Sequence, residues 1–217
     1  MKLTKEEIEK KYYAKFAASW VNHFYNLPRI VGETELVRAG LESGIDLHMF
    51  KRLDLLPRIS SVMGFLKAIR PFRMLDIGCG RGALIWPLLE VFPDIDLSVI
   101  DIDQKHIDRI NSVSTQCCPN LKGYSMDATS LAFDDNYFDC VTILEVLEHI
   151  PDWKKALLEG IRVSERHVVI SFPSKEDSNE EHIHLITKKD IIDCVSSVSD
   201  TIKPIFIPNH SIFIIRK

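Results

Sequence analysis

The sequence predicts an α/β fold: a doubly wound, mostly parallel sheet of seven strands that begins with a helical cap and ends in an antiparallel hairpin. From residue 73 onward, short apolar runs alternate with amphipathic segments, as expected when helices cover both faces of a parallel sheet. The last two β-rich runs are separated by a Pro-Asn turn, which favours a hairpin at one edge. The first 70 residues contain no comparable strand runs.

The expected elements follow one another regularly along the chain. The five parallel strands are expected over residues 73–78, 96–102, 121–127, 138–147 and 166–174. Amphipathic helices are expected over residues 83–92, 104–114, 152–164 and 187–198. The hairpin is expected over residues 202–209 and 210–217.

The chain divides into two predicted parts. Residues 1–70 are expected to form a helical cap, with helices over 5–26 and 53–69 and a glycine-containing stretch, 29–50, between them. Residues 71–217 are expected to form the sheet domain. We expect the cap to cover the functional site of that domain.

Composition is that of an ordinary soluble globular protein. Of 217 residues, 46 % are hydrophobic and 27 % are charged, and no apolar run approaches the length of about 18 residues that a membrane span needs. The N-terminal segment lacks the apolar region of a secretory signal, so we expect a cytoplasmic protein without membrane association. Five cysteines with no CxxC spacing suggest neither a disulfide framework nor a zinc site, so we expect reduced thiols.

Charge is distributed unevenly between the two parts. Residues 1–73 hold 13 Lys and Arg against 8 Asp and Glu, whereas the whole chain has a net charge of −4. The acidic balance of the sheet domain argues against extended nucleic-acid binding, for which a basic patch supplies most nonspecific affinity. A small-molecule partner is therefore favoured over a nucleic acid, and the oligomeric state is left open.

Three glycines at alternate positions follow the first expected strand, in the segment DIGCGRG. In an open parallel sheet, ligands bind beyond the carboxyl ends of the strands, and the loop after the first strand is the usual contact. Glycines allow a tight turn and let backbone amides approach a ligand without a Cβ between them. We interpret this loop as a ligand-binding loop.

Acidic residues lie at three successive strand ends. Asp76 precedes the glycines, Asp101 ends the second strand 21 residues after Gly80, and Asp127 ends the third. An acid at the second position accepts both hydroxyls of a ribose. Together these acids favour a neutral or cationic nucleoside and would repel a pyrophosphate. A nicotinamide-dependent oxidoreductase is disfavoured further because the glycine spacing is G-x-G-x-G and not G-x-G-x-x-G.

These segments resemble the class I S-adenosylmethionine-dependent methyltransferases, in particular the branch of small, single-domain, type 11-like enzymes. The resemblance lies in LDIGCGRG (75–82), VIDID (99–103), SMDATSLAF (125–133), FDCVTILEVLEHIPD (138–152) and HVVISFPS (167–174), in the order and spacing of that family. It implies a Rossmann-like fold, S-adenosyl-L-methionine as cofactor and S-adenosyl-L-homocysteine as product.

The resemblance also implies a set of cofactor contacts. Asp76 would hold the ammonium group directly or through water, Asp101 the ribose, and Asp127 the adenine amine. The glycine loop would line the methionine portion, with residues 99–102 and 126–128 flanking the adenine. The complete predicted set is Asp76, Gly78, Cys79, Gly80, Gly82, Asp101, Ile102, Met126, Asp127, Ala128 and Glu145. Cys79 is expected to be a small filler of the loop and not a nucleophile.

Candidate catalytic residues follow the fourth and fifth strands. Methyl transfer depends mainly on alignment of the reactants, so a dedicated catalytic residue is not required, although an oxygen or nitrogen nucleophile can need a base. Glu145, His149 and His184 are the candidates. Three interpretations stay open: a structural role, a base or hydrogen-bonding role, or a divalent metal site formed by these residues with Glu148.

The predicted function is methyl transfer from S-adenosylmethionine to an unidentified, small-molecule acceptor. One alternative is a metal-assisted RNA 2′-O-methyltransferase, because such enzymes use an ExxEH element with a later histidine. A second alternative is a nucleoside-binding regulator without catalysis. The sequence does not identify the acceptor, because acceptor pockets are built from variable caps and loops.

Overall fold

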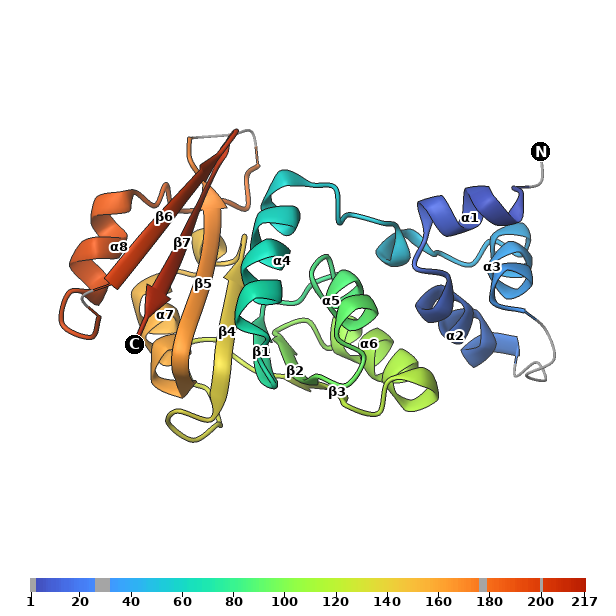
Figure 1. Cartoon of the computed structure of the whole chain (residues 1–217), viewed down its shortest axis with the longest axis horizontal. Helices are drawn as coiled ribbons and strands as arrows, with labels where there is room; N and C mark the ends of the chain where they lie inside the picture. Colours follow the sequence, from blue (N-terminus) through green and yellow to red (C-terminus); the bar gives the residue numbers. More distant parts are fainter. Residues whose placement is uncertain (1–2, 26–31, 176–178, 200) are drawn as a thin grey trace.

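The computed structural model describes residues 3–25, 32–175, 179–199 and 201–217 and contains one seven-stranded sheet (Figure 1). The strands are β1 (Arg73–Ile77), β2 (Asp96–Asp101), β3 (Leu121–Ser125), β4 (Phe138–Leu144), β5 (Ser164–Pro173), β6 (Thr201–Ile207) and β7 (His210–Arg216). Their order is β3-β2-β1-β4-β5-β7-β6, parallel except for β7, which is antiparallel to both β5 and β6. The predicted sheet with its C-terminal hairpin is confirmed.

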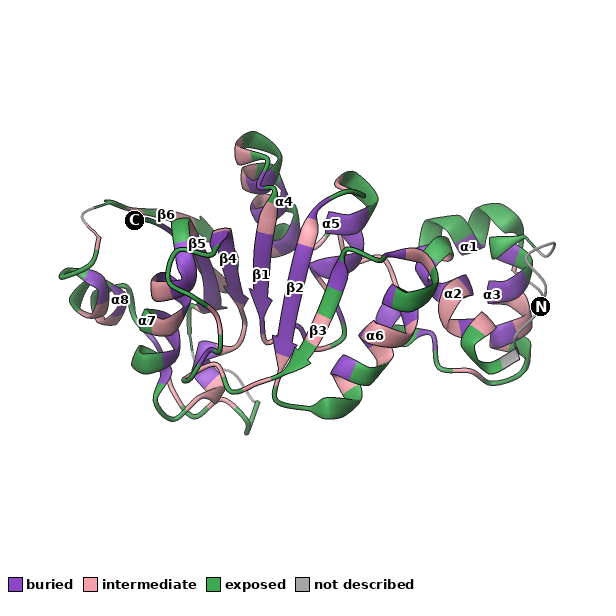
Figure 2. Ribbon diagram, turned by 90° about the horizontal axis from the view of Figure 1, so that it is seen from below, coloured by how far each residue is buried: buried purple, intermediate pink, exposed green. Residues whose placement is uncertain are grey.

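Helices cover both faces of this sheet. They are α4 (Pro57–Ile69), α5 (Ile85–Val91) and α6 (Gln104–Cys117) on one face, and α7 (Trp153–Val163) and α8 (Lys188–Val195) on the other. Alternate residues of each strand point to opposite faces of the sheet. Met74 therefore packs on the face that α4, α5 and α6 cover, whereas Leu75 and Ile77 pack on the face that α7 and α8 cover. Figure 2 shows β1 and β2 buried along most of their length and β3 largely exposed at the edge.

The N-terminal region is helical, as predicted, but its elements differ from the expectation. It contains α1 (Lys5–Lys11), α2 (Ala14–Tyr25), α3 (Glu33–Glu42) and the short helix η1 (His48–Phe50) before α4. The predicted helix over 5–26 is interrupted because Tyr12 forms an antiparallel bridge with Lys51. The helix α3, which was not predicted, buries Leu36 and Val37 against its neighbours.

These N-terminal helices pack against the side of the sheet domain. Phe16 of α2 contacts Trp86 of α5, with ring centroids 5.2 Å apart, and Asn22 donates a hydrogen bond to Gln116 of α6. The arrangement places α1 to α3 at the β3 end of the molecule, beside α6 (Figure 1). Among the described helices, none has the length and apolar character needed to cross a bilayer.

Candidate active site

A cavity of about 870 Å³ lies at the carboxyl ends of the parallel strands. Most of the predicted site residues line it: Gly78, Gly80, Asp101, Ile102, Met126, Asp127, Ala128, Glu145 and His149. Four predicted residues do not: Asp76, Cys79, Gly82 and His184. No described residue before β1 lines it either, although His48 contacts Arg81 of the glycine loop. That the N-terminal region covers the site therefore stays a prediction.

The loop that follows β1 needs glycine at three positions, for its backbone conformation and for the limited space around two of them. Gly78, Gly80 and Gly82 all have positive φ angles, of 71°, 47° and 82°, which favour glycine. A Cβ on Gly78 would lie 2.3 Å from Val146 Cγ2, and a Cβ on Gly82 would lie 2.6 Å from Trp86 Nε1. A Cβ on Gly80 would meet nothing within 4 Å. Gly80 is therefore the glycine that keeps the backbone open to a ligand.

Cys79, between the first two glycines, is buried. Burial and the nearby Asp76 and Asp101 raise the pKa of its thiol far above the ordinary range. The side chain is therefore a neutral thiol, which fits the expected filler and not a nucleophile.

Asp101 ties the end of β2 to the glycine loop. Its Oδ2 accepts a hydrogen bond of 2.7 Å from the Gly80 amide, and its Oδ1 accepts one of 2.9 Å from the Asp103 amide. His106 Nδ1 lies 3.4 Å from Oδ2. Each carboxylate oxygen has a second lone pair, so Asp101 can also accept hydroxyl hydrogens from a sugar in the cavity.

Asp76 lies behind the cavity wall. It is 5 % exposed, and its Oδ1 accepts a hydrogen bond of 2.5 Å from the Thr142 hydroxyl of β4. Burial raises the pKa of this carboxyl to about 7. The predicted contact with an ammonium group stays a prediction, and the position of Asp76 favours the water-mediated form of that contact.

The β2–β3 side of the cavity combines apolar surface with a carboxylate. Ile102 is 79 % exposed and lines the cavity with Met126 and Ala128. Asp127 Oδ1 accepts a hydrogen bond of 2.7 Å from the Thr129 amide, and this bond lowers the pKa of the Asp127 carboxyl. An apolar surface beside an ionised acid suits an aromatic base with an exocyclic amine. Acceptor carboxylates beside apolar surface therefore fit an adenosine derivative that has positive charges.

The predicted catalytic residues are brought only partly together. Glu145, at the end of β4, and His149 of the short helix η2 (Leu147–His149) both line the cavity. His149 Nδ1 donates a hydrogen bond of 3.0 Å to the Glu181 carbonyl. His184 does not line the cavity, but its Nε2 donates a hydrogen bond of 3.1 Å to the carbonyl of Pro151, which does. A catalytic role of His184 stays a prediction that this position does not favour.

The structure assembles a different metal-type cluster from the one predicted. Ligand atoms of Glu148, His149 and His182 lie within 4.8 Å of one another. The rings of His149 and His182 are in contact, with centroids 4.7 Å apart. Glu145 and His184, the other two predicted ligands, are bonded elsewhere. One carboxylate and two imidazoles are ligands that suit divalent transition metals.

His210, which sequence reasoning missed, does not line the cavity but contacts Glu145, which does. Its Nε2 lies 3.1 Å from Glu145 Oε2, although 65 residues separate the two along the chain. Pairing of β7 with β5 brings them together. The one sequence signal was the position of His210 at the predicted hairpin turn, which places it at the same edge of the sheet as the carboxyl end of β5.

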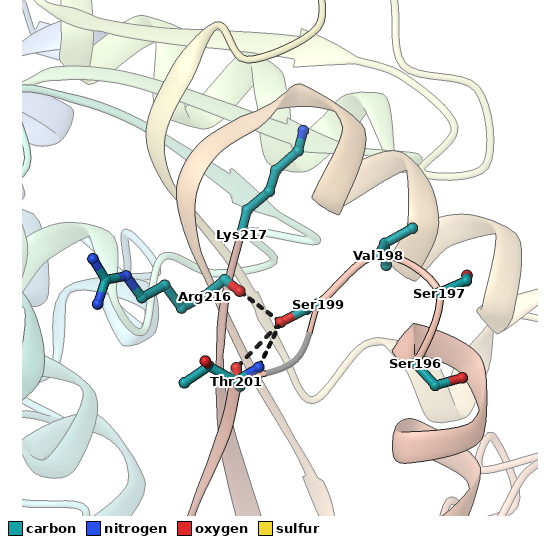
Figure 3. A pocket seen from close by; sticks show the side chains of 7 residues that line it. All are labelled: Ser196, Ser197, Val198, Ser199, Thr201, Arg216 and Lys217. Atoms are coloured by element: carbon teal, nitrogen blue, oxygen red, sulfur yellow. Dashed lines mark hydrogen bonds between the residues drawn. The ribbon is translucent and has the colours of Figure 1, made fainter.

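A second hollow, of about 420 Å³, lies at the opposite end of β7 (Figure 3). The Ser199 hydroxyl there donates its one hydrogen to the Arg216 carbonyl, lies 3.2 Å from the Thr201 carbonyl, and accepts a hydrogen bond from the Thr201 amide. Lys217 Nζ is held by the carbonyls of Ile161, Arg162 and Ser164. These polar groups are bonded to backbone carbonyls of the turn, of the end of α7 and of the start of β5, so we interpret the hollow as a structural feature.

Comparisons with known proteins relate part of this chain to methyltransferases. A family model described as a methyltransferase domain matches residues 74–166. The demethylmenaquinone methyltransferase of Renibacterium salmoninarum is 33 % identical over 48 % of this chain and 41 % of its own length. The ubiquinone/menaquinone biosynthesis C-methyltransferase UbiE of Francisella philomiragia is 29 % identical over 42 % of this chain and 38 % of its own. The matched part of this chain thus spans about two fifths of the length of these curated relatives.

A solved structure of similar fold is a SAM-dependent methyltransferase from Aquifex aeolicus, with a TM-score of 0.60 and 14 % identity. The match covers 82 % of this chain and 96 % of that one. The predicted Rossmann-like fold is confirmed, and the match of a methyltransferase-domain model to residues 74–166 supports the predicted enzyme class and cofactor. Residues 74–166 of the chain thus match a methyltransferase domain, and the whole sheet domain shares its fold with a SAM-dependent methyltransferase.

Proposed function

We propose that this protein transfers a methyl group from S-adenosylmethionine to a small, neutral or cationic acceptor. The observation that supports the proposal is the charge of the cavity wall. Six carboxylates and no Lys or Arg are among the described residues that line it; the six are Asp101, Asp103, Asp127, Glu145, Asp152 and Glu181. Such a wall attracts a cofactor with sulfonium and ammonium groups and repels phosphate groups.

The chain's own residues have separate tasks in this proposal. Bound S-adenosylmethionine supplies a methyl group on a positively charged sulfur. Asp101 binds the ribose and, through the Gly80 amide, fixes the glycine loop. Ile102 and Met126 exclude water from the base, and Asp127 accepts hydrogens from its amine. Alignment of the acceptor with the methyl group then supplies much of the acceleration, on the order of 7–11 kcal/mol for well-oriented reactants.

The names of the curated relatives suggest one acceptor class. Both relatives are named as methyltransferases of quinone synthesis, and their similarity covers mainly the methyltransferase domain. A reduced quinone is neutral and is compatible with the acidic wall. We therefore propose a hydroquinone as the first acceptor to test.

Two titrations and one turnover assay test the function. Calorimetry with S-adenosylmethionine, S-adenosylhomocysteine and NAD should give binding of the first two only. Turnover is then measured by mass spectrometry with a short-chain demethylmenaquinol, a small primary amine and a short RNA. Methylation of the quinol or the amine supports the proposal. Binding of NAD alone contradicts it, and binding without turnover of any acceptor favours the nucleoside-binding regulator.

A metal-assisted RNA 2′-O-methyltransferase is the second candidate. The cluster of Glu148, His149 and His182 supports its metal requirement, whereas the acidic wall opposes its RNA substrate. The chelator-treated protein is melted with and without Mn²⁺, and RNA methylation is measured in both states. A rise in Tm that His182→Ala abolishes and the matched His184→Ala retains would favour this candidate.

The predicted cytoplasmic location remains part of the proposal.

A further inference from the structure

Glu145 has a backbone conformation that is unusual for its residue type. Its φ angle is 57°, in the left-handed region that favours glycine. Strained residues of this kind persist where the surroundings hold them, and they cluster at functional sites. The Glu145 amide donates a hydrogen bond of 2.9 Å to the Ser171 carbonyl of β5, which holds the backbone in place.

The Glu145 carboxylate is held from two sides. Oε1 accepts a hydrogen bond of 2.6 Å from the Ser171 hydroxyl, and Ser171 is fully buried. Oε2 lies 3.1 Å from His210 Nε2. Glu145 directly follows β4, Ser171 is in β5 and His210 is in β7, and these three strands are neighbours in the sheet (Figure 1). Both carboxylate oxygens therefore have a fixed partner on the sheet side.

His210 is itself fixed by the hairpin turn. It pairs with Pro173 at the end of β5, and the Ser174 amide donates a hydrogen bond of 2.9 Å to the Asn209 carbonyl. Because a carboxylate only accepts hydrogen bonds, the hydrogen of His210 that faces Glu145 must be on Nε2. The imidazole is thus a hydrogen-bond donor to Glu145.

The position of Glu145 in the cavity suggests what its charge does. The acids at the ends of β2 and β3 lie on one side of the glycine loop, and β4 lies on the other side of β1. Val146, the next residue, packs directly on Gly78 of that loop. The Glu145 carboxylate therefore lies beside the glycine loop, away from the acids assigned to the ribose and the adenine.

We propose that His210 is a positioning residue: with Ser171, it fixes the Glu145 carboxylate beside the glycine loop, so that the site prefers the cationic methyl donor over its demethylated product. This inference rests on the proposed function. S-adenosylmethionine has one positive charge more than S-adenosylhomocysteine, at the sulfur. A fixed carboxylate near that atom strengthens binding of the donor and favours release of the product.

The test is the ratio of the two dissociation constants, Kd of S-adenosylhomocysteine over Kd of S-adenosylmethionine, measured by calorimetry. Glu145→Gln should lower this ratio by about tenfold, the equivalent of a charge interaction of about 1.4 kcal/mol. His210→Ala should lower it by at least about threefold, and His210→Gln, which keeps an N–H donor, should restore most of it. Ser171→Ala repeats the test from β5 should His210→Ala not fold.

A double-mutant cycle separates positioning from a general structural role. If His210 acts through Glu145, His210→Ala should leave the ratio unchanged in the Glu145→Gln background. A purely structural role would weaken binding of both ligands equally and leave the ratio unchanged in the wild-type background as well. An unchanged or raised ratio in His210→Ala would overturn the inference while leaving the function intact. If neither ligand binds the wild-type protein, the proposed function itself fails.

Discussion

Replacing Asp76 with asparagine should make the protein less sensitive to pH. The Asp76 carboxyl is buried, and its burial raises the pKa from the ordinary 3.8 to about 7. Since the pKa in the folded state is above that in the unfolded state, the folded state favours the protonated carboxyl. The protonated Asp76 carboxyl therefore contributes to the free energy of unfolding. This contribution is fully present below about pH 4 and is lost as the pH rises to about 7.

The magnitude follows from the size of the shift. A pKa difference of about three units, at about 1.4 kcal/mol per unit, corresponds to about 4 kcal/mol. Asparagine does not ionise, and its oxygen can still accept the Thr142 hydroxyl hydrogen. Relative to the wild type, Asp76→Asn should therefore gain about 4 kcal/mol in free energy of unfolding between pH 4 and pH 7.5.

Urea unfolding of the ligand-free protein, followed by circular dichroism from pH 4 to pH 8, measures this gain. Asp127→Asn is the matched control. The pKa of Asp127 is lowered in the folded state, so its contribution is present above its unfolded pKa and is lost only as the pH falls below that range. The difference between that control and the wild type should be constant over most of the range. A constant difference for Asp76→Asn would refute the argument.

Three further predictions concern the glycine loop and its partners. Asp101→Ala should weaken S-adenosylhomocysteine binding at least about tenfold in calorimetry with an unchanged circular dichroism spectrum, because a hydrogen bond to a charged group contributes about 1.5–3 kcal/mol; unaltered affinity would contradict the ribose assignment. Gly80→Val should abolish binding, and Gly80→Ala should lower Tm less than Gly82→Ala, because both glycines have positive φ angles but only a Cβ on Gly82 would lie 2.6 Å from Trp86 Nε1; equal losses of Tm in the two alanine variants would show that the loop is placed wrongly. Cys79→Ala should keep the affinity within about threefold, since its raised thiol pKa excludes a thiolate, and a large loss would refute the filler role.

The fold was predictable because it depends on local patterns. Short apolar runs alternate with amphipathic segments, and each run became a strand or helix within a few residues of the expected bounds. The N-terminal region was less predictable because tertiary contacts decide it. The Tyr12–Lys51 bridge interrupts a segment whose local pattern is continuously helical, and α3 forms in a stretch where glycines favoured a loop.

The site was predictable where it depends on strand ends. Asp101, Asp127 and Glu145 meet at one edge because the carboxyl ends of parallel strands lie together. Asp76 differs because it lies within β1, opposite Thr142 in the register with β4, so its side chain is buried. No pattern along the chain distinguishes an acid among the last residues of a strand, whose side chain can be buried in the sheet, from one that follows the strand.

The histidines show a different limit. The prediction for His182 and His184 assumed an extended segment, in which alternate residues share a side. In the structure this segment is a turn followed by irregular backbone, so His182 contacts His149 while His184 bonds to Pro151. His210 was out of reach because its contact with Glu145 depends on the pairing of β7 with β5.

A crystal structure with S-adenosylhomocysteine tests the central claim most directly. The account predicts the ligand in the cavity of about 870 Å³, with its ribose hydroxyls on Asp101, its base between Ile102 and Met126, and its amino-acid portion against the glycine loop. Electron density for the ligand elsewhere, or in this cavity with Asp101 turned away from the sugar, would contradict it.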